Sequence, residues 1–242
     1  GPPFTAITES YNGTSWTEVN DLNTARRQLA GAGTNTAALG FGGYNPTLPV
    51  SPIANTESWN GTNWTEVNDL NTARSRLAGA GIQTAALAFG GDPSTAVTET
   101  WNGTNWTEVN DLNTARRELA GAGTNTAALA FGASPSLALT ESWNGTNWTE
   151  VNDLNTGRGA LGGVGVDNTS ALAFGGEGPA VTGATESWNG TNWTEVADLG
   201  TARYALAGAG IQTAALAFGG QPSGTLTEEW NSGPATVTIT TD

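Results

Sequence analysis

The 242-residue sequence contains no cysteine, histidine, methionine or lysine. Without histidine and cysteine the chain lacks the usual general base at neutral pH, the usual nucleophile pairs and the commonest ligands of transition metals. Disulfides are excluded as staples. We therefore expect a protein that is not an enzyme, with no catalytic residue, no cofactor-binding residue and no metal ligand.

Charged residues are also scarce, at 12%, and the excess of acidic ones gives a net charge of −14. Such a chain has no basic patch for nucleic acid or for membranes rich in acidic lipid. No apolar run reaches the length of about 18 residues that crosses a membrane, and no signal peptide is visible. We expect a protein or a glycan as partner, no nucleic acid and no membrane insertion.

What the sequence does have is one repeat unit, copied along its whole length. The aromatic residue that opens the motif W-N-G-T, or a variant of it, marks each copy: Tyr11, Trp59, Trp101, Trp143, Trp188 and Trp230. Successive marks lie forty-odd residues apart, a period typical of propellers and solenoids.

One copy predicts four short strands. Residues 77–81 (LAGAG) and 84–89 (TAALAF) form an inner pair, and residues 97–101 (VTETW) and 106–109 (WTEV) form an outer pair. The Asn102-Gly103 dipeptide between the outer strands is a strong hairpin signal, because both residues tolerate a positive φ. Helices are disfavoured, since the apolar runs are short and glycine, threonine and asparagine interrupt them.

Small residues in the first strand and tryptophan in the last fit a propeller blade that widens from its axis outward. This pattern resembles the kelch repeat, in which an apolar strand ends in a glycine pair and two aromatics follow. The glycine pairs are Gly42-Gly43, Gly90-Gly91, Gly175-Gly176 and Gly219-Gly220, with Gly132-Ala133 as a departure. The resemblance implies a galactose-oxidase-type propeller without the copper ligands, and it implies little about function.

Five inner pairs predict an all-β, five-bladed β-propeller of four-stranded antiparallel blades, closed by the N-terminal outer strands. We expect one domain over residues 1–242, with residues 1–3 a remnant of tag removal and residues 231–242 an atypical strand or linker. Two segments, 4–11 and 225–230, compete for the third strand of the last blade. Either one of them is displaced, or the last blade has extra strands, or the chain was cut from a longer protein. We expect a monomer or a strand-swapped oligomer.

Carboxylates recur in every copy, at Glu108 and Asp111 in one of them, and Arg116 follows this Asp by five residues. A charge-paired or hydrogen-bonded loop in each repeat is the favoured interpretation. A calcium site built from the N-D-L-N oxygens is the alternative, although its spacing is not that of an EF-hand. Four carboxylates stand outside the repeated pattern: Glu118, Glu177, Glu228 and Glu229.

Tryptophan pairs have two interpretations. Buried between blades they are structural, and exposed beside asparagine they stack on sugars. We favour packing for the eight that recur: Trp59, Trp64, Trp101, Trp106, Trp143, Trp148, Trp188 and Trp193.

The copies differ at two places, the pair of residues after T-A-R and the loop after the glycine pair. In an up-and-down blade both places lie at the same end, so we predict a partner-binding face there. Its candidate residues are Tyr44, Arg76, Asp92, Arg117, Glu118, Glu177, Tyr204 and Gln221. The expected function is a non-catalytic structural or recognition module, part of a larger extracellular or virion-associated protein. The alternative is a lectin-like propeller with one weak site per blade.

Overall fold

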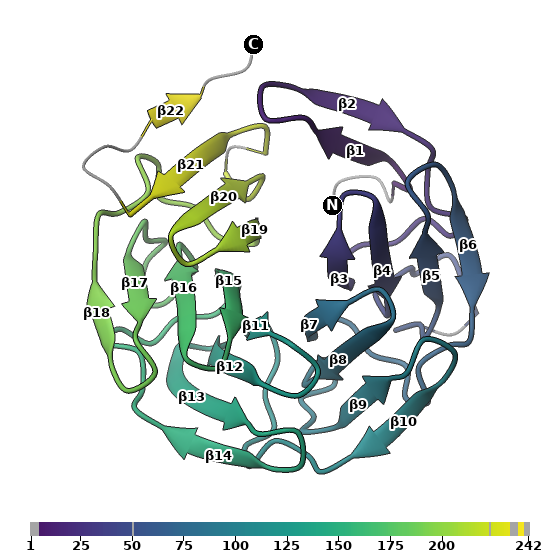
Figure 1. The fold of residues 1–242 in the computed structure, drawn as a ribbon, viewed down its shortest axis with the longest axis horizontal. Coiled ribbons are helices and arrows are strands. Elements are labelled where there is room, and N and C mark those ends of the chain that lie inside the picture. Colours follow the sequence, from purple (N-terminus) through teal and green to yellow (C-terminus); the bar gives the residue numbers. More distant parts are fainter. Residues whose placement is uncertain (1–4, 50, 223, 233–236, 240–242) are drawn as a thin grey trace. The chain divides into compact units, whose positions relative to one another are not determined.

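The structure is a computed structural model that describes residues 5–49, 51–222, 224–232 and 237–239. It divides into two compact units, Gly1–Ala115 and Arg116–Asp242. All the secondary-structure elements of the described residues are β-strands (Figure 1). No helix long and apolar enough to cross a membrane occurs in this part of the chain.

The first unit contains one two-stranded sheet and two four-stranded antiparallel sheets. The two-stranded sheet consists of β1 (Thr8–Tyr11) and β2 (Trp16–Val19). Blade A consists of β3 (Ala30–Thr34), β4 (Ala37–Phe41), β5 (Thr56–Trp59) and β6 (Trp64–Val67). Blade B consists of β7 (Ala78–Ile82), β8 (Ala85–Phe89), β9 (Thr98–Trp101) and β10 (Trp106–Val109).

The second unit contains three four-stranded antiparallel sheets. Blade C consists of β11 (Ala120–Gly123), β12 (Ala128–Ala133), β13 (Leu137–Trp143) and β14 (Trp148–Val151). Blade D consists of β15 (Gly162–Asp167), β16 (Ser170–Phe174), β17 (Thr185–Trp188) and β18 (Trp193–Glu195). Blade E consists of β19 (Ala207–Ile211), β20 (Ala214–Phe218), β21 (Thr227–Asn231) and β22 (Val237–Ile239).

The second strand of each complete blade supplies the core. In blade B the four residues from Ala86 to Phe89 are all fully buried, as an apolar strand covered on both faces should be. The turn from β9 to β10 is held by Asn102, whose Oδ1 accepts the amides of Thr104 and Asn105 at 2.9 Å. Gly103 completes this turn with a φ of 93°. All four strands of this copy lie within a residue of their predicted bounds.

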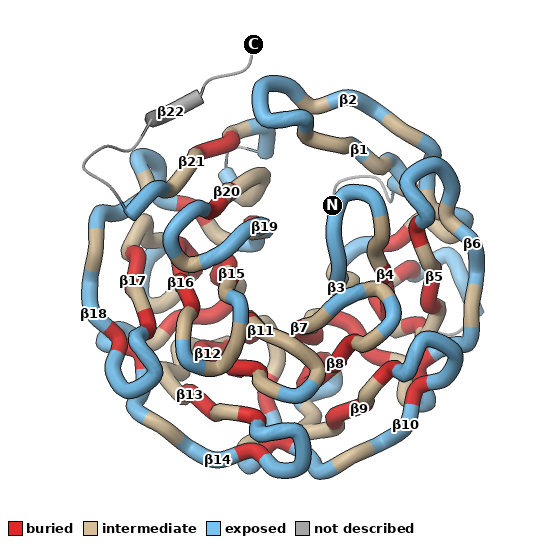
Figure 2. The backbone as a smooth tube through the Cα atoms, in the orientation of Figure 1, coloured by how far each residue is buried: buried red, intermediate tan, exposed pale blue. Residues whose placement is uncertain are grey.

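Glycine in the first strand lets adjacent blades approach. A Cβ on Gly79 in β7 would lie 2.7 Å from the Phe41 ring and 2.9 Å from the Gly31 carbonyl oxygen, both in blade A. The Phe41 ring in turn packs on Trp106 of blade B, with 4.9 Å between the ring centroids. Figure 2 shows the resulting buried stretches along β4, β5, β8 and β9. Blade B therefore fills a space that blade A leaves open.

The last blade resolves the competition for its third strand. β20 pairs with β21, and Phe218 lies opposite Thr227. β22, from the stretch expected to be atypical, pairs with β21 as the fourth strand. β1 and β2 form a sheet of their own. Closure of the propeller by β1 and β2, and the single-domain organisation, stay predictions.

Candidate functional site

The segments that join one blade to the next form a polar junction, illustrated by residues 68–74 between blades A and B. Asp69 Oδ1 accepts the backbone amide of Thr56 in blade A at 3.0 Å. Asn68 Nδ2 donates to the carbonyl oxygen of Thr104 in blade B at 3.0 Å. Leu70 between them is buried. The uniform sequence of this segment is therefore explained by contacts with two blades at once.

An ion pair lies buried behind this segment. Arg74 Nη2 lies 3.0 Å from Glu99 Oε1 in β9, and both side chains are fully buried. The other carboxylate oxygen accepts two bonds from Asn71, at 2.7 Å from the backbone amide and 2.8 Å from the side chain. Burial lowers the pKa of Arg74, and the charge of Glu99 opposes that shift. The same pair recurs in the other four complete blades as Arg26–Glu57, Arg116–Glu141, Arg158–Glu186 and Arg203–Glu228.

The arginine partner thus differs from the aspartate suggested by sequence spacing. Asp69 binds a backbone amide, and the glutamate of the T-E dipeptide in the third strand binds the arginine. Glu228, first grouped with the carboxylates outside the repeat, is the Glu99 equivalent of blade E. The signal was present in the sequence, because T-E precedes every aromatic that marks a repeat.

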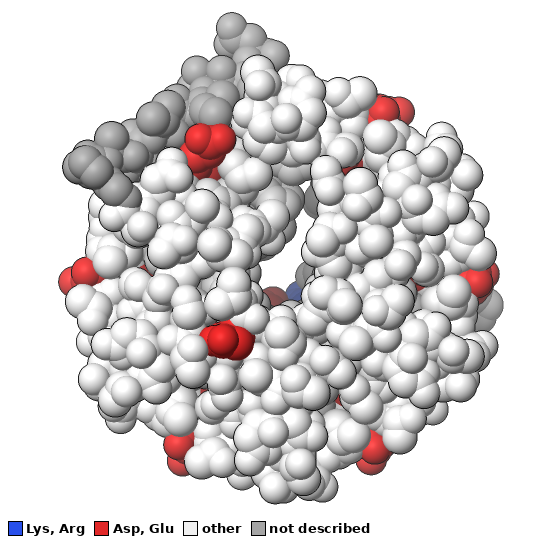
Figure 3. Space-filling model, in the orientation of Figure 1, with Lys and Arg blue, Asp and Glu red and all other residues white. Residues whose placement is uncertain are grey.

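No metal site is indicated at these junctions. Within the described ranges no group of three or more histidine, cysteine, aspartate or glutamate side chains is placed to hold a metal ion. The N-D-L-N side chains instead bind backbone and carboxylate groups, as Asp69 and Asn71 do. The repeated glutamates of the fourth strand, such as Glu108, are exposed. Figure 3 shows acidic side chains as separate groups within a largely uncharged surface.

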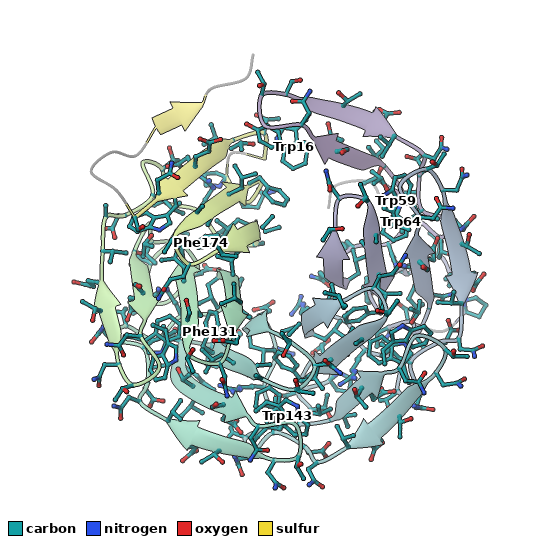
Figure 4. All side chains as sticks on the ribbon, viewed as in Figure 1. Trp16, Trp59, Trp64, Phe131, Trp143 and Phe174 are labelled. Carbon is teal, nitrogen blue, oxygen red and sulfur yellow. The ribbon has the colours of Figure 1, made fainter. Side chains whose placement is uncertain are left out.

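The tryptophans serve as packing residues in the blades. Of the eight predicted structural tryptophans, Trp64 is half-buried. The other seven are buried: Trp59, Trp101, Trp106, Trp143, Trp148, Trp188 and Trp193. Within a blade the two rings lie side by side, as Trp59 and Trp64 do with 5.4 Å between centroids (Figure 4). A buried ring offers no face on which a sugar can stack.

The eight residues of the predicted partner-binding face occupy a repeated backbone frame. In each blade the first residue of the varied loop donates its amide to the carbonyl of the residue after the buried arginine. The five bonds, of 2.6 to 3.1 Å, are Tyr44 to Arg27, Asp92 to Ser75, Ser134 to Arg117, Glu177 to Gly159 and Gln221 to Tyr204. The two varied places of each blade are therefore adjacent, as the strand order predicted.

The next residue in the frame adopts a left-handed backbone. Its φ lies between 51° and 58° at Gln28, Arg76, Glu118, Ala160 and Ala205. This conformation is uncommon for residues other than glycine. It directs the amide to the preceding blade: Ala160 N donates to Glu118 O, and Ala205 N to Ala160 O, both at 2.7 Å. The strain is thus part of the architecture, while the side chain at this position is glutamine, arginine, glutamate or, twice, alanine.

In the first unit this frame presents Tyr44, Arg76 and Asp92. The Arg27 guanidinium lies over the Tyr44 ring, 5.3 Å from its centroid. In the second unit, the frame presents Arg117, Glu118, Glu177, Tyr204 and Gln221, of which Glu177 and Gln221 are exposed and the others half-buried. Each unit therefore combines aromatic or cationic side chains with acidic ones.

The opposite end of the blades is less uniform than the Asn-Gly turns suggested. The inner hairpin turns lie there too, and two of them carry a glutamine that binds the preceding blade. Gln83 Nε2 donates to Ser58 Oγ at 3.0 Å, and Gln212 Nε2 donates to Ser187 Oγ at 3.0 Å. Ile82 and Ile211, just before these glutamines, are exposed. The inner turns are a third varied place, which we did not predict.

A scan against protein-family models finds no match, and a search of the curated proteins finds none. Solved structures do match, among them the structure of YjhT. Its TM-score is 0.73 at 12% sequence identity, and the match covers 94% of this chain and 95% of that one. At this identity the likeness shows the fold alone. Together with the five four-stranded sheets, it confirms the predicted all-β, five-bladed β-propeller class.

Proposed function

We propose that this chain is a non-catalytic recognition module of the kelch-like propeller type, and that a protein partner binds the varied backbone frame. The observation that carries the proposal is the contrast within each blade. The frame bond between the residue after the buried arginine and the start of the loop is present in all five blades, yet no two blades present the same pair of side chains. A rigid scaffold with varied loops is a common way to build binding sites.

Arginine and tyrosine on the frame favour a protein partner. Both residue types are enriched at binding hot spots, where they combine buried area with directional hydrogen bonds. Arg117 and Tyr204 supply them in the second unit, with Glu177 at the same end of its blade to orient a cationic group. A glycan partner is less favoured, because seven of the eight repeated tryptophans are buried and offer no face for stacking.

The proposal places this module within a larger extracellular or virion-associated protein. A surface with few charges and a strong acidic excess is suited to selective contact rather than to electrostatic capture of polyanions. The absence of histidine and cysteine from the sequence favours a binding role over an enzymatic one.

A display library of random peptides, selected against the intact chain, tests the site. We expect selected peptides to bind an Arg117→Ala/Tyr204→Ala variant about tenfold or more weakly, as hot-spot truncation does. The matched control is Thr149→Ala/Thr191→Ala, two exposed threonines in the outer strand and outer turn of the same unit. Both variants must keep the parent melting temperature.

Three outcomes contradict the proposal. Loss of binding in the threonine variant alone places the site on the outer strands and turns. Binding to a glycan array that survives Arg117→Ala/Tyr204→Ala supports a lectin-like propeller instead. Turnover of a hydrolysable substrate by the chain would contradict its non-catalytic character.

A further inference from the structure

The sheet of β1 and β2 reproduces the outer half of a blade, and we call it the half blade. Trp16 lies opposite Tyr11, as Trp64 lies opposite Trp59 in blade A. Trp64 Nε1 donates to Thr8 Oγ1 of β1 at 3.0 Å, as the equivalent tryptophan of blade B donates to blade A at 3.1 Å. The half blade therefore meets blade A as blade A meets blade B.

The half blade lacks the inner pair that every complete blade has. In blade A the third strand, β5, pairs with β4 on one edge and β6 on the other. β1 occupies the same place and pairs with β2, and no strand of the described residues pairs along its other edge. An open strand edge presents unpaired N–H and C=O groups to another chain.

Two polar side chains of β1, Glu9 and Tyr11, occupy positions whose counterparts in blade B contact the inner pair. Glu9 is the counterpart of Glu99, but it is exposed and has no ion-pair partner among the residues that the structure describes. Tyr11 is the counterpart of Trp101, whose indole N–H donates to the Gln83 carbonyl at the tip of the inner hairpin. The Tyr11 hydroxyl is buried without a hydrogen-bond partner in the described chain.

Blade A likewise lacks, on the side of the half blade, contacts that blade B makes with blade A. A Cβ on Gly79 would meet Phe41 and Gly31 of the preceding blade, whereas the nearest atom to a Cβ on Gly31 is Leu39 O in its own blade, at 3.3 Å. Trp106, which packs on Phe41, is 5% exposed. Trp64 is half-buried, and no phenylalanine of the described residues packs on it. Figure 2 shows β3 exposed along much of its length.

We propose that the half blade and blade A together bind one peptide segment with the chemistry of an inner hairpin of this repeat. The contacts that are missing define its chemistry. It should carry an arginine that pairs with Glu9, a phenylalanine that packs on the face of Trp64, and a first strand of small residues that lies beside β3. In the register of blade B, where Ala88 pairs with Glu99, the incoming strand would place an alanine opposite Glu9 and a phenylalanine opposite Thr8. The hairpin tip would offer a carbonyl to Tyr11.

The probe is a synthetic peptide of residues 71–91. It contains Asn71 and Arg74, which bind Glu99 in blade B, and Phe89, the counterpart of Phe41. We expect it to bind the intact chain and to raise its melting temperature in a concentration-dependent way, because a ligand of the folded state stabilises that state. Isothermal titration calorimetry should give one site per chain. A peptide with Phe89→Ala should bind more weakly.

A charge cycle separates this site from nonspecific strand addition. Glu9→Gln in the chain should weaken peptide binding by about 100-fold, since it leaves the peptide arginine buried without a partner. Arg74→Gln in the peptide should do the same. Combining both should restore part of the affinity, because no unpaired charge then remains. Glu18→Gln on β2, an exposed glutamate of the same half blade, is the matched control and should leave binding unchanged.

A fused chain provides the second measurement if the peptide aggregates. In this fusion, residues 71–96 are placed directly before Ile7, just as they directly precede its counterpart Val97 in blade B. The fusion should melt at a higher temperature than the parent, and Arg74→Gln in the added segment should remove that gain. Equal melting temperatures for fusion and parent would overturn the proposal. So would a binding constant that Glu9→Gln leaves unchanged.

Discussion

The two junctions of the first unit differ by one hairpin. Between blades A and B the tryptophan of the fourth strand is buried against Phe41, and Glu99 is buried against Arg74. Between the half blade and blade A the outer contacts are the same, but Trp64 is half-buried and Glu9 is exposed. The outer strands therefore dock without the inner pair, whereas burial of the aromatic and of the carboxylate depends on it.

This difference shows what the inner pair contributes. A lone glutamate on an outer strand remains solvated, so it carries no desolvation cost. In a complete blade the same glutamate is removed from water. In blade B the arginine, Asn71 and the backbone amide of Thr72 compensate for that cost. The buried pair thus favours the correct assembly of a blade more than it adds net stability.

The largest expected effect comes from the aromatic. Trp106→Ala removes a ring that packs on Phe41 and donates to Thr56 Oγ1, so it should lower the free energy of unfolding by about 3 to 5 kcal/mol. Trp64→Ala at the incomplete junction should cost clearly less, about 2 kcal/mol, because this ring is half-buried. Urea denaturation of both variants measures the difference, and equal losses would show that the junctions are energetically alike.

The next largest difference in stability should be between substitutions of the two equivalent glutamates. Glu99→Gln leaves Arg74 buried without an anionic partner and should cost about 3 kcal/mol, the lower end of the range for breaking buried pairs. Glu9→Gln changes an exposed side chain and should stay within about 0.5 kcal/mol of the parent. Melting curves at neutral pH test both. A large loss in the Glu9 variant would mean that this carboxylate is already paired in solution.

The sequence predicted the blades because their signals are local. Alternation in the outer strands, the Asn-Gly turn and the glycine-rich inner strand each act within a few residues, and blade B begins and ends where they indicate. The adjacency of the two varied places also followed, because up-and-down strand order fixes which ends of strands meet. These features need no knowledge of side-chain partners.

Side-chain partners were harder to predict because they lie far apart in the chain. Arg74 binds a glutamate 25 residues later, across a varied loop, while the aspartate five residues before it binds a backbone amide in the preceding blade. Spacing favours the near acid, but sheet register selects the distant one. The vacant place at β1 was likewise invisible, since only the structure shows that β21 occupies the third place in blade E.

Two glycines at the same position of the first strand give the smallest and most selective test. Gly79→Ala introduces a Cβ 2.7 Å from the Phe41 ring and 2.9 Å from the Gly31 carbonyl oxygen, and this overpacking should cost about 1 to 3 kcal/mol. Gly31→Ala meets only the Leu39 carbonyl oxygen, at 3.3 Å, so its effect should stay within about 0.5 kcal/mol. The comparison becomes sharper when a hairpin occupies the half blade. The phenylalanine of that hairpin would then lie against Gly31, as Phe41 lies against Gly79. In the fusion that carries residues 71–96, Gly31→Ala should become as costly as Gly79→Ala. An unchanged cost of Gly31→Ala in the fusion would show that the added hairpin does not pack beside β3.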